Sequence, residues 1–253
     1  MYPFYNMKKK PSKKFSNVYE DTRRAEAYSA LKFDKTYYLA YRDLPAIISH
    51  HAQGTHALDF GCGTGRSTRF LQTLGYKTIG IDISEEMITI ARRLDPAGEY
   101  IRIDDGDFSR LPSDFFDLIL SAFTFDNIPT MEKKITLFND LSTLLTQHGT
   151  IINLVSSPEI YTHEWASFTT KDFPENHKAK TGDVVRIITT DIADARPCDD
   201  IFWTEEDYAM VFSQANLRII KKFKPLATGE EPYQWINETR IAPWTIYVLK
   251  KKT

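Results

Sequence analysis

A glycine-rich turn is the segment of this sequence whose residue types and spacing say most about chemistry. The turn, Gly61-Cys62-Gly63-Thr64-Gly65, follows the apolar run His56–Phe60 and opens a helical pattern. Glycines let the backbone approach a ligand closely, and the first N–H groups of the helix are free to bind it. With Asp59 two residues before the first glycine, the pattern is D-x-G-x-G-x-G. A dinucleotide-binding turn requires a third glycine where this chain has Arg66, which argues against that class of site.

Two further acids follow the next apolar runs. Asp82 stands at the end of the run Thr78–Ile83, 23 residues after Asp59, where a carboxylate can accept both hydroxyl groups of a ribose. Gly106-Asp107-Phe108 follows the third run, and an acid beside an aromatic ring can bond an adenine amino group and stack on its base. Because the carboxyl ends of parallel strands meet at one edge of a sheet, these groups predict a nucleoside-containing ligand there.

The elements that must position these groups alternate between strands and helices. Short apolar runs and helical patterns alternate from Ala57 to Val155, which is typical of a parallel sheet with crossover helices. Ser84 and Thr130 are the expected N-caps of the second and third helices, and Gly149 is expected to end the third. The expected strands are His56–Phe60, Thr78–Ile83, Tyr100–Ile103, Phe116–Ser121 and Ile151–Val155.

The pattern is less regular beyond residue 156. One clear strand, Val184–Thr189, is expected before Thr204, which caps a helix with Asp207 in the capping-box position. Two more strands follow, Leu217–Lys224 and Thr245–Lys250, separated by a loop of about 20 residues, a length that is usually functional or disordered. We expect a basic, flexible tail over residues 1–14 and one domain over residues 15–253. In the domain, residues 15–54 are expected to form cap helices and residues 55–155 the core. Residues 156–202 are expected to form an insertion that covers the substrate, and residues 203–253 a helix and strands.

At this point the chain resembles the class I S-adenosylmethionine-dependent methyltransferases. The residues that carry the resemblance are Leu58–Gly65, Gly80–Ser84 with Met87, Gly106–Phe108 with Leu111-Pro112, and Phe116–Ser121. The resemblance covers about residues 55–155. It implies an α/β fold of the Rossmann-like type, in which a seven-stranded, mostly parallel sheet has an antiparallel last strand and helices on both faces.

The resemblance also implies roles for individual residues. The methionine part of S-adenosylmethionine would lie along Gly61, Cys62 and Gly63, in the turn that follows Asp59. Asp82 would hold the ribose, and Ile83 and Met87 would flank the adenine. The remaining expected contacts are Asp107 and Phe108 at the adenine, Ser121 and Phe123 beside the sulfonium, and Arg42, from the N-terminal helices, at the cofactor carboxylate.

The insertion is expected to contact the substrate. His163 or Glu164 could act as a general base there, although Tyr161, Trp165 and Phe168 around them also fit plain helix packing. Residues 156–202 hold nine acids against five bases, which disfavours a polyanionic substrate and favours a neutral or cationic small molecule. The six histidines show no metal-ligand spacing, so no metal is expected.

Composition limits the class of protein. The 253 residues are 42% hydrophobic and 26% charged, which is ordinary for a globular domain. No apolar run reaches the length of a membrane helix, the N-terminus does not look like a signal peptide, and two distant cysteines fit a reduced, cytoplasmic protein. Five lysines in the first 14 residues leave a charge of −7 for the rest, which argues against a broad nucleic-acid surface.

Several functions stay open at this stage. The first is methyl transfer to a small molecule by a monomer or homodimer. The second is RNA or protein methylation, which the lysine-rich tail alone supports. The third is a non-catalytic S-adenosylmethionine-binding module, and the fourth, disfavoured by Arg66, is a nicotinamide oxidoreductase.

Overall fold

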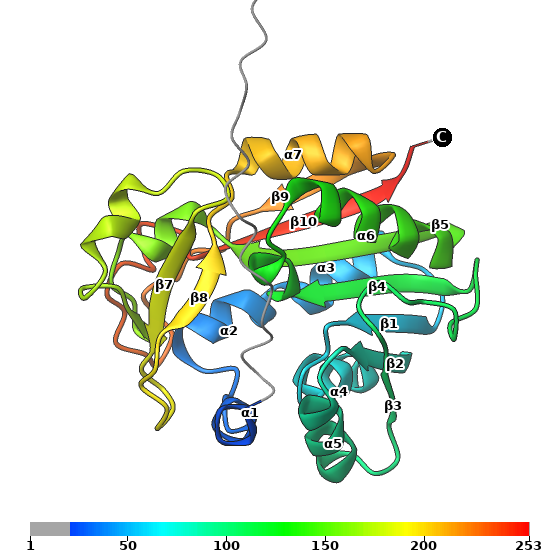
Figure 1. The fold of residues 1–253 in the computed structure, drawn as a ribbon, viewed down its shortest axis with the longest axis horizontal. Helices are drawn as coiled ribbons and strands as arrows, with labels where there is room; N and C mark the ends of the chain where they lie inside the picture. The colour runs from blue at the N-terminus through cyan, green and yellow to red at the C-terminus, as the bar shows by residue number, and fades with distance from the viewer. Residues whose placement is uncertain (1–20, 253) are drawn as a thin grey trace, which may run out of the picture.

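A seven-stranded sheet runs through the centre of the fold (Figure 1). The structure, a computed structural model, describes residues 21–252, so the predicted tail and the first residues of the cap segment lie outside the described part. The strands are β1 (His56–Phe60), β2 (Lys77–Asp82), β3 (Glu99–Arg102), β4 (Phe116–Ala122), β5 (Leu145–Ser156), β9 (Leu217–Phe223) and β10 (Trp244–Lys251).

The strand order is β3-β2-β1-β4-β5-β10-β9. The first five strands pair in parallel, whereas β10 pairs antiparallel with both β5 and β9. This confirms the predicted fold class, including its antiparallel last strand. Because β1 and β4 are central, their side chains are buried on both faces of the sheet: Leu118 and Leu120 lie in one apolar cluster, and Ile119 lies in the other.

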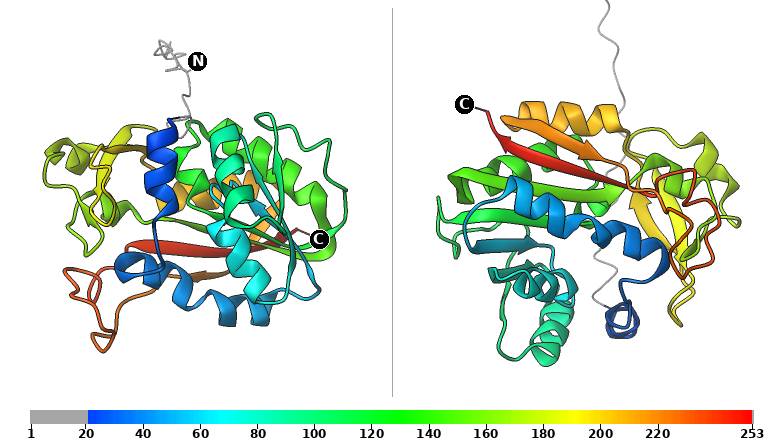
Figure 2. Two further views of the ribbon diagram at one scale, coloured as in Figure 1. Left: turned by 90° about the horizontal axis from the view of Figure 1, so that it is seen from below. Right: turned by 180° about the vertical axis from the view of Figure 1, so that it is seen from behind.

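Helices cover both faces of the sheet (Figure 2). The cluster on one face includes residues of α6 and α7, and the opposite cluster includes residues of α2, α3 and α4. Ser84, Thr130 and Thr204 each cap a helix through the side chain as predicted, Thr204 in a full capping box with Asp207. The helices are α1 (Thr22–Ser29), α2 (Lys35–Arg42), α3 (Leu44–His51), α4 (Arg66–Thr73), α5 (Glu85–Leu94), α6 (Met131–Leu144) and α7 (Glu205–Gln214).

Gly149 has a different role from the predicted helix terminator. Helix α6 ends at Leu144, and β5 starts at once with Leu145 in extended conformation, so Gly149 lies inside the strand. A Cβ atom on Gly149 would lie 2.9 Å from the carbonyl oxygen of Phe116 and 2.8 Å from Leu145 Cδ2. The glycine therefore permits close approach of β4 and β5, where their register shifts.

The insertion folds into a small antiparallel sheet of its own, in the order β6-β7-β8. Strand β7 (Val184–Thr189) has the predicted bounds, whereas β6 (Phe168–Thr169) and β8 (Cys198–Ile201) were not predicted. Two short 3₁₀ helices, η3 (Pro158–Tyr161) and η4 (Pro174–Lys178), precede β7. Figure 1 shows β7 and β8 beside α1 and α2, at one end of the main sheet.

Candidate active site

The glycine-rich turn leaves β1 at the carboxyl edge of the sheet and enters α4. Gly61, Gly63 and Gly65 have φ values of 72°, 52° and 79°, a region that residues with a Cβ atom rarely adopt. The backbone N–H groups of Gly61 and Cys62 both donate to the carbonyl oxygen of Ile81, at 2.9 Å. The turn is thereby bound to the end of the neighbouring strand β2.

Asp59 supports the turn from beneath. Its carboxylate is 0% exposed, and Oδ2 accepts hydrogen bonds from Ser67 Oγ at 2.7 Å and Thr68 Oγ1 at 2.6 Å. Both hydroxyl groups belong to the first turn of α4. Asp59 therefore fixes the start of this helix, and its influence on a ligand would act through the shape of the turn.

Burial of Asp59 gives a testable pH dependence. Desolvation raises its pKa from 3.8 to about 6, although the Thr68 and Ser67 hydroxyl groups oppose the rise. The folded state thus binds more protons than the unfolded state between about pH 4 and 6, so the free energy of unfolding falls as the pH rises through that window. We expect Asp59→Asn, measured by denaturant unfolding, to remove on the order of 2–3 kcal/mol of this pH dependence.

The control for this measurement is Asp172→Asn, because Asp172 is exposed. That variant should keep the wild-type dependence of stability on pH. If Asp59→Asn and wild type follow parallel curves from pH 4 to 7, the carboxylate does not titrate in this range and the assignment is wrong.

Gly61 has no room for a side chain. A Cβ atom there would lie 2.1 Å from Thr124 Oγ1, which itself donates to the carbonyl oxygen of Phe60 at 2.9 Å. We expect Gly61→Ala to destabilise the fold by about 2–4 kcal/mol and to abolish ligand binding at the turn. Gly75→Ala is the matched control, because Gly75 also has a positive φ but nothing within 4 Å of its Cβ position. Equal thermal stability of the two variants would contradict this prediction.

Asp82 lies at the end of β2, facing the turn. Its Oδ2 accepts a hydrogen bond from the Gly63 N–H and its Oδ1 one from the Ser84 N–H, each at 2.9 Å. Burial raises the pKa of Asp82, and these backbone hydrogen bonds oppose the rise. The carboxylate thus joins the glycine-rich turn to the start of α5. Met87, on the first turn of α5, is buried beside Tyr28 of α1.

The remaining predicted residues lie near the same edge with unequal exposure. Ile83 and Phe108 pack against the apolar cluster of the sheet, with the Phe108 and Phe60 ring centroids 6.0 Å apart. Asp107 is exposed, and its Oδ1 accepts a hydrogen bond from the Ser109 N–H. Ser121 is fully buried in β4, and its Oγ has no hydrogen-bond partner within residues 21–252.

Phe123 bends the chain directly after β4. It has a φ of 67°, a strained conformation for a residue with a side chain, of the kind that is concentrated at functional sites. Its ring centroid lies 4.7 Å from that of Trp244 and 6.0 Å from that of Tyr37. Phe123 therefore forms an aromatic wall between the end of β4 and the cap helices.

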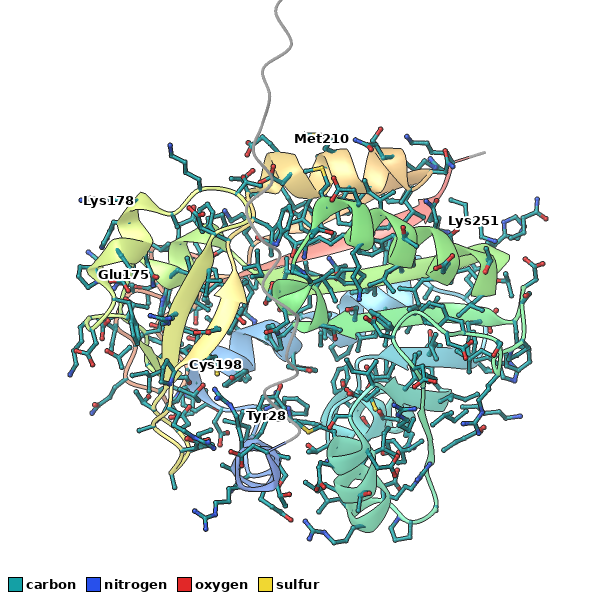
Figure 3. All side chains as sticks on the ribbon, in the orientation of Figure 1. Tyr28, Glu175, Lys178, Cys198, Met210 and Lys251 are labelled. Carbon is teal, nitrogen blue, oxygen red and sulfur yellow. The ribbon has the colours of Figure 1, made fainter. Side chains whose placement is uncertain are left out.

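A pocket adjoins this wall. Figure 3 shows Tyr28 and Cys198, which both line it, near each other below β8. Tyr28 also approaches the glycine-rich turn, because a Cβ atom on Gly63 would lie 3.8 Å from its ring. The pocket is lined by parts of α1, α2, η2 (Thr124–Asn127), the insertion and β10.

Comparison with known proteins agrees with this geometry. Residues 58–153 match a family profile described as a methyltransferase domain. An uncharacterized methyltransferase of Alkaliphilus oremlandii is 28% identical over 161 residues, which are 62% of this chain and 72% of that protein. An uncharacterized methyltransferase of Bacillus subtilis is 31% identical over 126 residues, 48% of this chain and 58% of that protein.

Solved structures show the same fold. An S-adenosylmethionine-dependent methyltransferase from Clostridium acetobutylicum superposes with a TM-score of 0.60 at 15% identity, covering 93% of this chain and 97% of its own. The matched profile contains the turn, Asp82 and Asp107, which the fold brings to one edge of the sheet. Residues 58–153 therefore match a methyltransferase domain, in a fold shared with S-adenosylmethionine-dependent methyltransferases of known structure.

The residues of this methyltransferase fit its cofactor. The three positive-φ glycines form a cradle that side chains would fill, and the buried Asp82 carboxylate at the end of β2 offers acceptor oxygens suited to ribose hydroxyl groups. Gly61–Gly63 and Asp82 would therefore hold S-adenosylmethionine. Within residues 21–252, no group of three or more histidine, cysteine or acidic side chains is arranged to hold a metal ion, and no helix is long and apolar enough to cross a membrane.

Arg66 is a feature of the site that sequence reasoning did not assign. Its guanidinium lies 5.0–5.9 Å from the ring centroids of Tyr28, Phe33, Tyr37 and Tyr41. Nη1 donates to the carbonyl oxygen of Lys32 at 3.4 Å, and no carboxylate of residues 21–252 forms an ion pair with it. This cation, held among aromatic rings at the first position of α4, adjoins the glycine-rich turn. The signal for Arg66 in the sequence is its position directly after Gly65, the last glycine of the turn.

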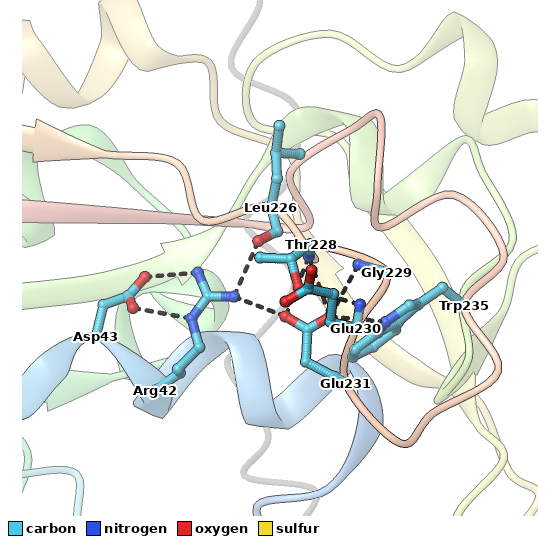
Figure 4. Close-up of polar contacts among 8 residues, drawn as sticks. All are labelled: Arg42, Asp43, Leu226, Thr228, Gly229, Glu230, Glu231 and Trp235. Carbon is cyan, nitrogen blue, oxygen red and sulfur yellow. Dashed lines mark hydrogen bonds and ion pairs between the residues drawn. The ribbon is translucent and has the colours of Figure 1, made fainter.

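The structure does not bring Arg42 to this edge of the sheet. Figure 4 shows its guanidinium between Asp43 and the loop that follows β9. Nε and Nη2 donate to the two oxygens of Asp43 at 2.8 and 2.9 Å, while Nη1 donates to Leu226 O and Glu231 Oε1 at 3.0 and 3.1 Å. Through these contacts Arg42 joins α2 to the loop. The predicted contact was instead with the carboxylate of the cofactor.

His163 and Glu164 are also placed differently from the expectation. Tyr161, Trp165 and Phe168 are buried and pack into the core, which leaves His163 and Glu164 on the outer side of the segment, off the pocket lining. Glu164 Oε1 accepts a hydrogen bond from the Thr170 N–H at 2.6 Å. Burial raises the pKa of Glu164, but hydrogen bonds from Thr169 and Thr170 outweigh it and lower the pKa overall. Both side chains thus stabilise a turn of the insertion.

Proposed function

We propose that this chain transfers the methyl group of S-adenosylmethionine to a small molecule bound in the pocket beside Phe123. The observation that carries the proposal is a pocket lined by α1, the insertion and β10, next to the cofactor cradle. Aromatic side chains together with charged groups line the pocket, a mixture that is typical of small-molecule sites. A polynucleotide or a folded protein would need a more open approach.

The cofactor supplies a methyl group on a sulfonium, which an in-line displacement can transfer. The protein must then place the acceptor and exclude water. We assign Gly61–Gly63 and Asp82 to holding the cofactor, and Arg66, in place of Arg42, to pairing with its carboxylate. Phe123 and Tyr28, at the junction of cradle and pocket, would exclude water from the reacting atoms.

One relative supports a small-molecule acceptor. A demethylmenaquinone methyltransferase of Tropheryma whipplei is 38% identical over 81 residues, 31% of this chain and 34% of that protein. The name of that relative describes a methyl acceptor that is a small molecule. The acidic balance of the insertion also disfavours nucleic acid.

The test begins with thermal melting in the presence of S-adenosylmethionine, S-adenosylhomocysteine or NAD. Ligand at about 100 times its dissociation constant should add roughly 2.7 kcal/mol to stability, and we expect this for the first two ligands and not for NAD. Radiolabelled cofactor is then incubated with fractionated cell extract. Label in the small-molecule fraction supports the proposal. Label in RNA or protein, lost when residues 1–14 are deleted, would replace it with the macromolecular alternative.

A further inference from the structure

Two carboxylates from distant parts of the chain line the same pocket. Asp126 lies in η2, directly after β4, and Asp200 lies in β8 of the insertion. Both oxygens of Asp126 accept from the Ser156 N–H, at 3.2 and 3.1 Å. Asp200 Oδ2 accepts a hydrogen bond from Tyr161 OH at 3.1 Å. With the side-chain amide of Asn127 rotated by 180°, its nitrogen donates to Asp200 Oδ1 at 3.3 Å. Few donors thus satisfy two largely buried carboxylates.

The basic groups around the pocket have other hydrogen-bond partners, but the positive charges of Arg24 and Lys134 also lower the pKa of Asp200, and that of Lys134 lowers the pKa of Asp126. Arg196 pairs with Asp194 at 2.7 Å and Asp21 at 2.6 Å, and Arg24 donates to the Pro197 carbonyl oxygen and to Cys198 Sγ. The third cation, the buried Lys134 of α6, lies outside the lining, and its Nζ donates to the carbonyl oxygen of Phe125.

Other titratable groups face the two carboxylates from the neighbouring elements. They are Tyr161 of η3, Tyr208 of α7, and Cys198 and Asp199 of β8. Burial, reinforced by the charge of Asp200, raises the pKa of Asp126 to about 7, and burial raises that of Asp200 to about 6. Burial thus raises both pKa values toward neutral pH, and a ligand cation placed beside the pair would favour loss of a proton from it.

We propose that this end of the pocket binds the ammonium group of an amine, which is the methyl acceptor, and that Asp200 takes its proton. The inference deepens the proposed function and rests on it. Two buried carboxylates attract a cation and repel a carboxylate or phosphate. The aromatic faces of Tyr28, Phe123 and Trp244, which line the same pocket, suit the apolar body of such an amine and also attract its charge.

The proposed step balances in protons and electrons. The ammonium gives one proton to the Asp200 carboxylate, which frees the lone pair of the amine nitrogen. That lone pair forms the new N–CH₃ bond while the S–CH₃ bond of the cofactor breaks and its electron pair stays on sulfur. The product leaves as a methylated ammonium, and Asp200 returns its proton to solvent.

The test compares three probes that share a phenyl ring and differ in the head group: benzylamine, benzyl alcohol and benzoate. Each is titrated by calorimetry into the full chain saturated with S-adenosylhomocysteine, at pH 6.5. We expect benzylamine to bind about tenfold or more tightly than benzoate, as for a buried charge-assisted hydrogen bond. Repeating the titration in two buffers with different ionisation enthalpies should show proton release when benzylamine binds.

Asp200→Asn should remove the preference for benzylamine and reduce the proton release, which then comes from Asp126 alone. Asparagine keeps an oxygen that can accept from Tyr161 OH, so the pocket should keep its shape, and a melting curve checks the fold. The matched control is Asp199→Asn, the neighbouring acid, which is 49% exposed and pairs with Arg186 at 3.0 Å. Asp199 does not line the pocket, so that variant should keep the preference for benzylamine over benzoate.

Three outcomes would overturn the inference: equal or tighter binding of benzoate, an Asp200→Asn variant with the wild-type preference, or no probe binding at all. None of these affects the proposed function if S-adenosylhomocysteine still binds and label still enters small molecules. Label found in RNA or protein would instead contradict the proposed function, whatever the probes show.

Discussion

Asp82→Ala is expected to weaken the binding of S-adenosylhomocysteine by about 100-fold or more. The carboxylate accepts the Gly63 and Ser84 N–H groups, so its loss frees the glycine-rich turn as well as removing the proposed ribose acceptor. Each hydrogen bond to a charged group contributes about 1.5–3 kcal/mol, and two such bonds account for a loss of this size. Isothermal titration calorimetry measures the dissociation constant directly.

The control for Asp82 comes from the opposite end of the same sheet. Asp117 Oδ2 accepts the Thr55 and His56 N–H groups at 2.9 and 3.0 Å, next to the start of β1. Asp117→Ala therefore removes a carboxylate with two backbone partners, away from the carboxyl edge of the strands. It should lower stability and leave the affinity for the cofactor product unchanged. An Asp82→Ala variant that binds within a few-fold of wild type would refute the assignment of this edge.

A large loss of stability is also expected from Glu238→Gln. This side chain is 0% exposed, and four donors from three segments meet it. Oε1 accepts from Thr36 Oγ1 and the Ala166 N–H, both at 2.7 Å, and Oε2 accepts from the N–H groups of Ile236 and Asn237, at 2.9 and 3.1 Å. In the variant, the amide nitrogen of glutamine would replace one of these oxygens. Because this nitrogen is itself a donor, it could not accept the hydrogen bonds that the oxygen accepts. We expect a cost of about 3 kcal/mol, or a melting point lower by roughly 6–12 °C.

Glu230→Gln tests whether this loss belongs to the buried position. Glu230 lies on the same loop and is exposed, so its substitution should change the melting point by no more than a degree or two. A small effect of Glu238→Gln, similar to that of Glu230→Gln, would mean that the loop, α2 and the insertion are held together by packing alone.

The sequence was sufficient to predict the main sheet because two strong signals coincide there. Strands buried on both faces are continuous apolar runs, and Ser84, Thr130 and Thr204 carry local capping signals that depend on few other residues. The glycine-rich turn is likewise local, since the positive φ angles follow from the residue types. These features depend on near neighbours in the chain, so single-sequence reasoning could find them.

The substrate side of the site depends on contacts between distant residues. Strand β8 contains two adjacent acids, Asp199 and Asp200, so it carries no apolar alternation, and only pairing with β7 makes it a strand. Asp126 and Asp200 meet across 74 positions of sequence, which no local pattern records. A signal did exist for Asp126, because it follows β4 at the edge where the other site residues gather. In the sequence, Arg66 likewise stands out only because it occupies the position of the third glycine of a dinucleotide-binding turn.

The position of β10 has a consequence for how the chain assembles. β10 follows β9 in sequence but lies between β5 and β9 in the sheet. Residues 157–243 lie between β5 and β10 in the sequence, although the two strands are paired. The β5–β10 contacts therefore have high contact order, and closing this long segment is slow relative to forming β1 to β5. Until β10 inserts, β9 has no partner, and β5 presents an open, apolar edge. The cofactor-binding half can thus form early, whereas the pocket, whose lining includes Trp244 of β10, is completed last.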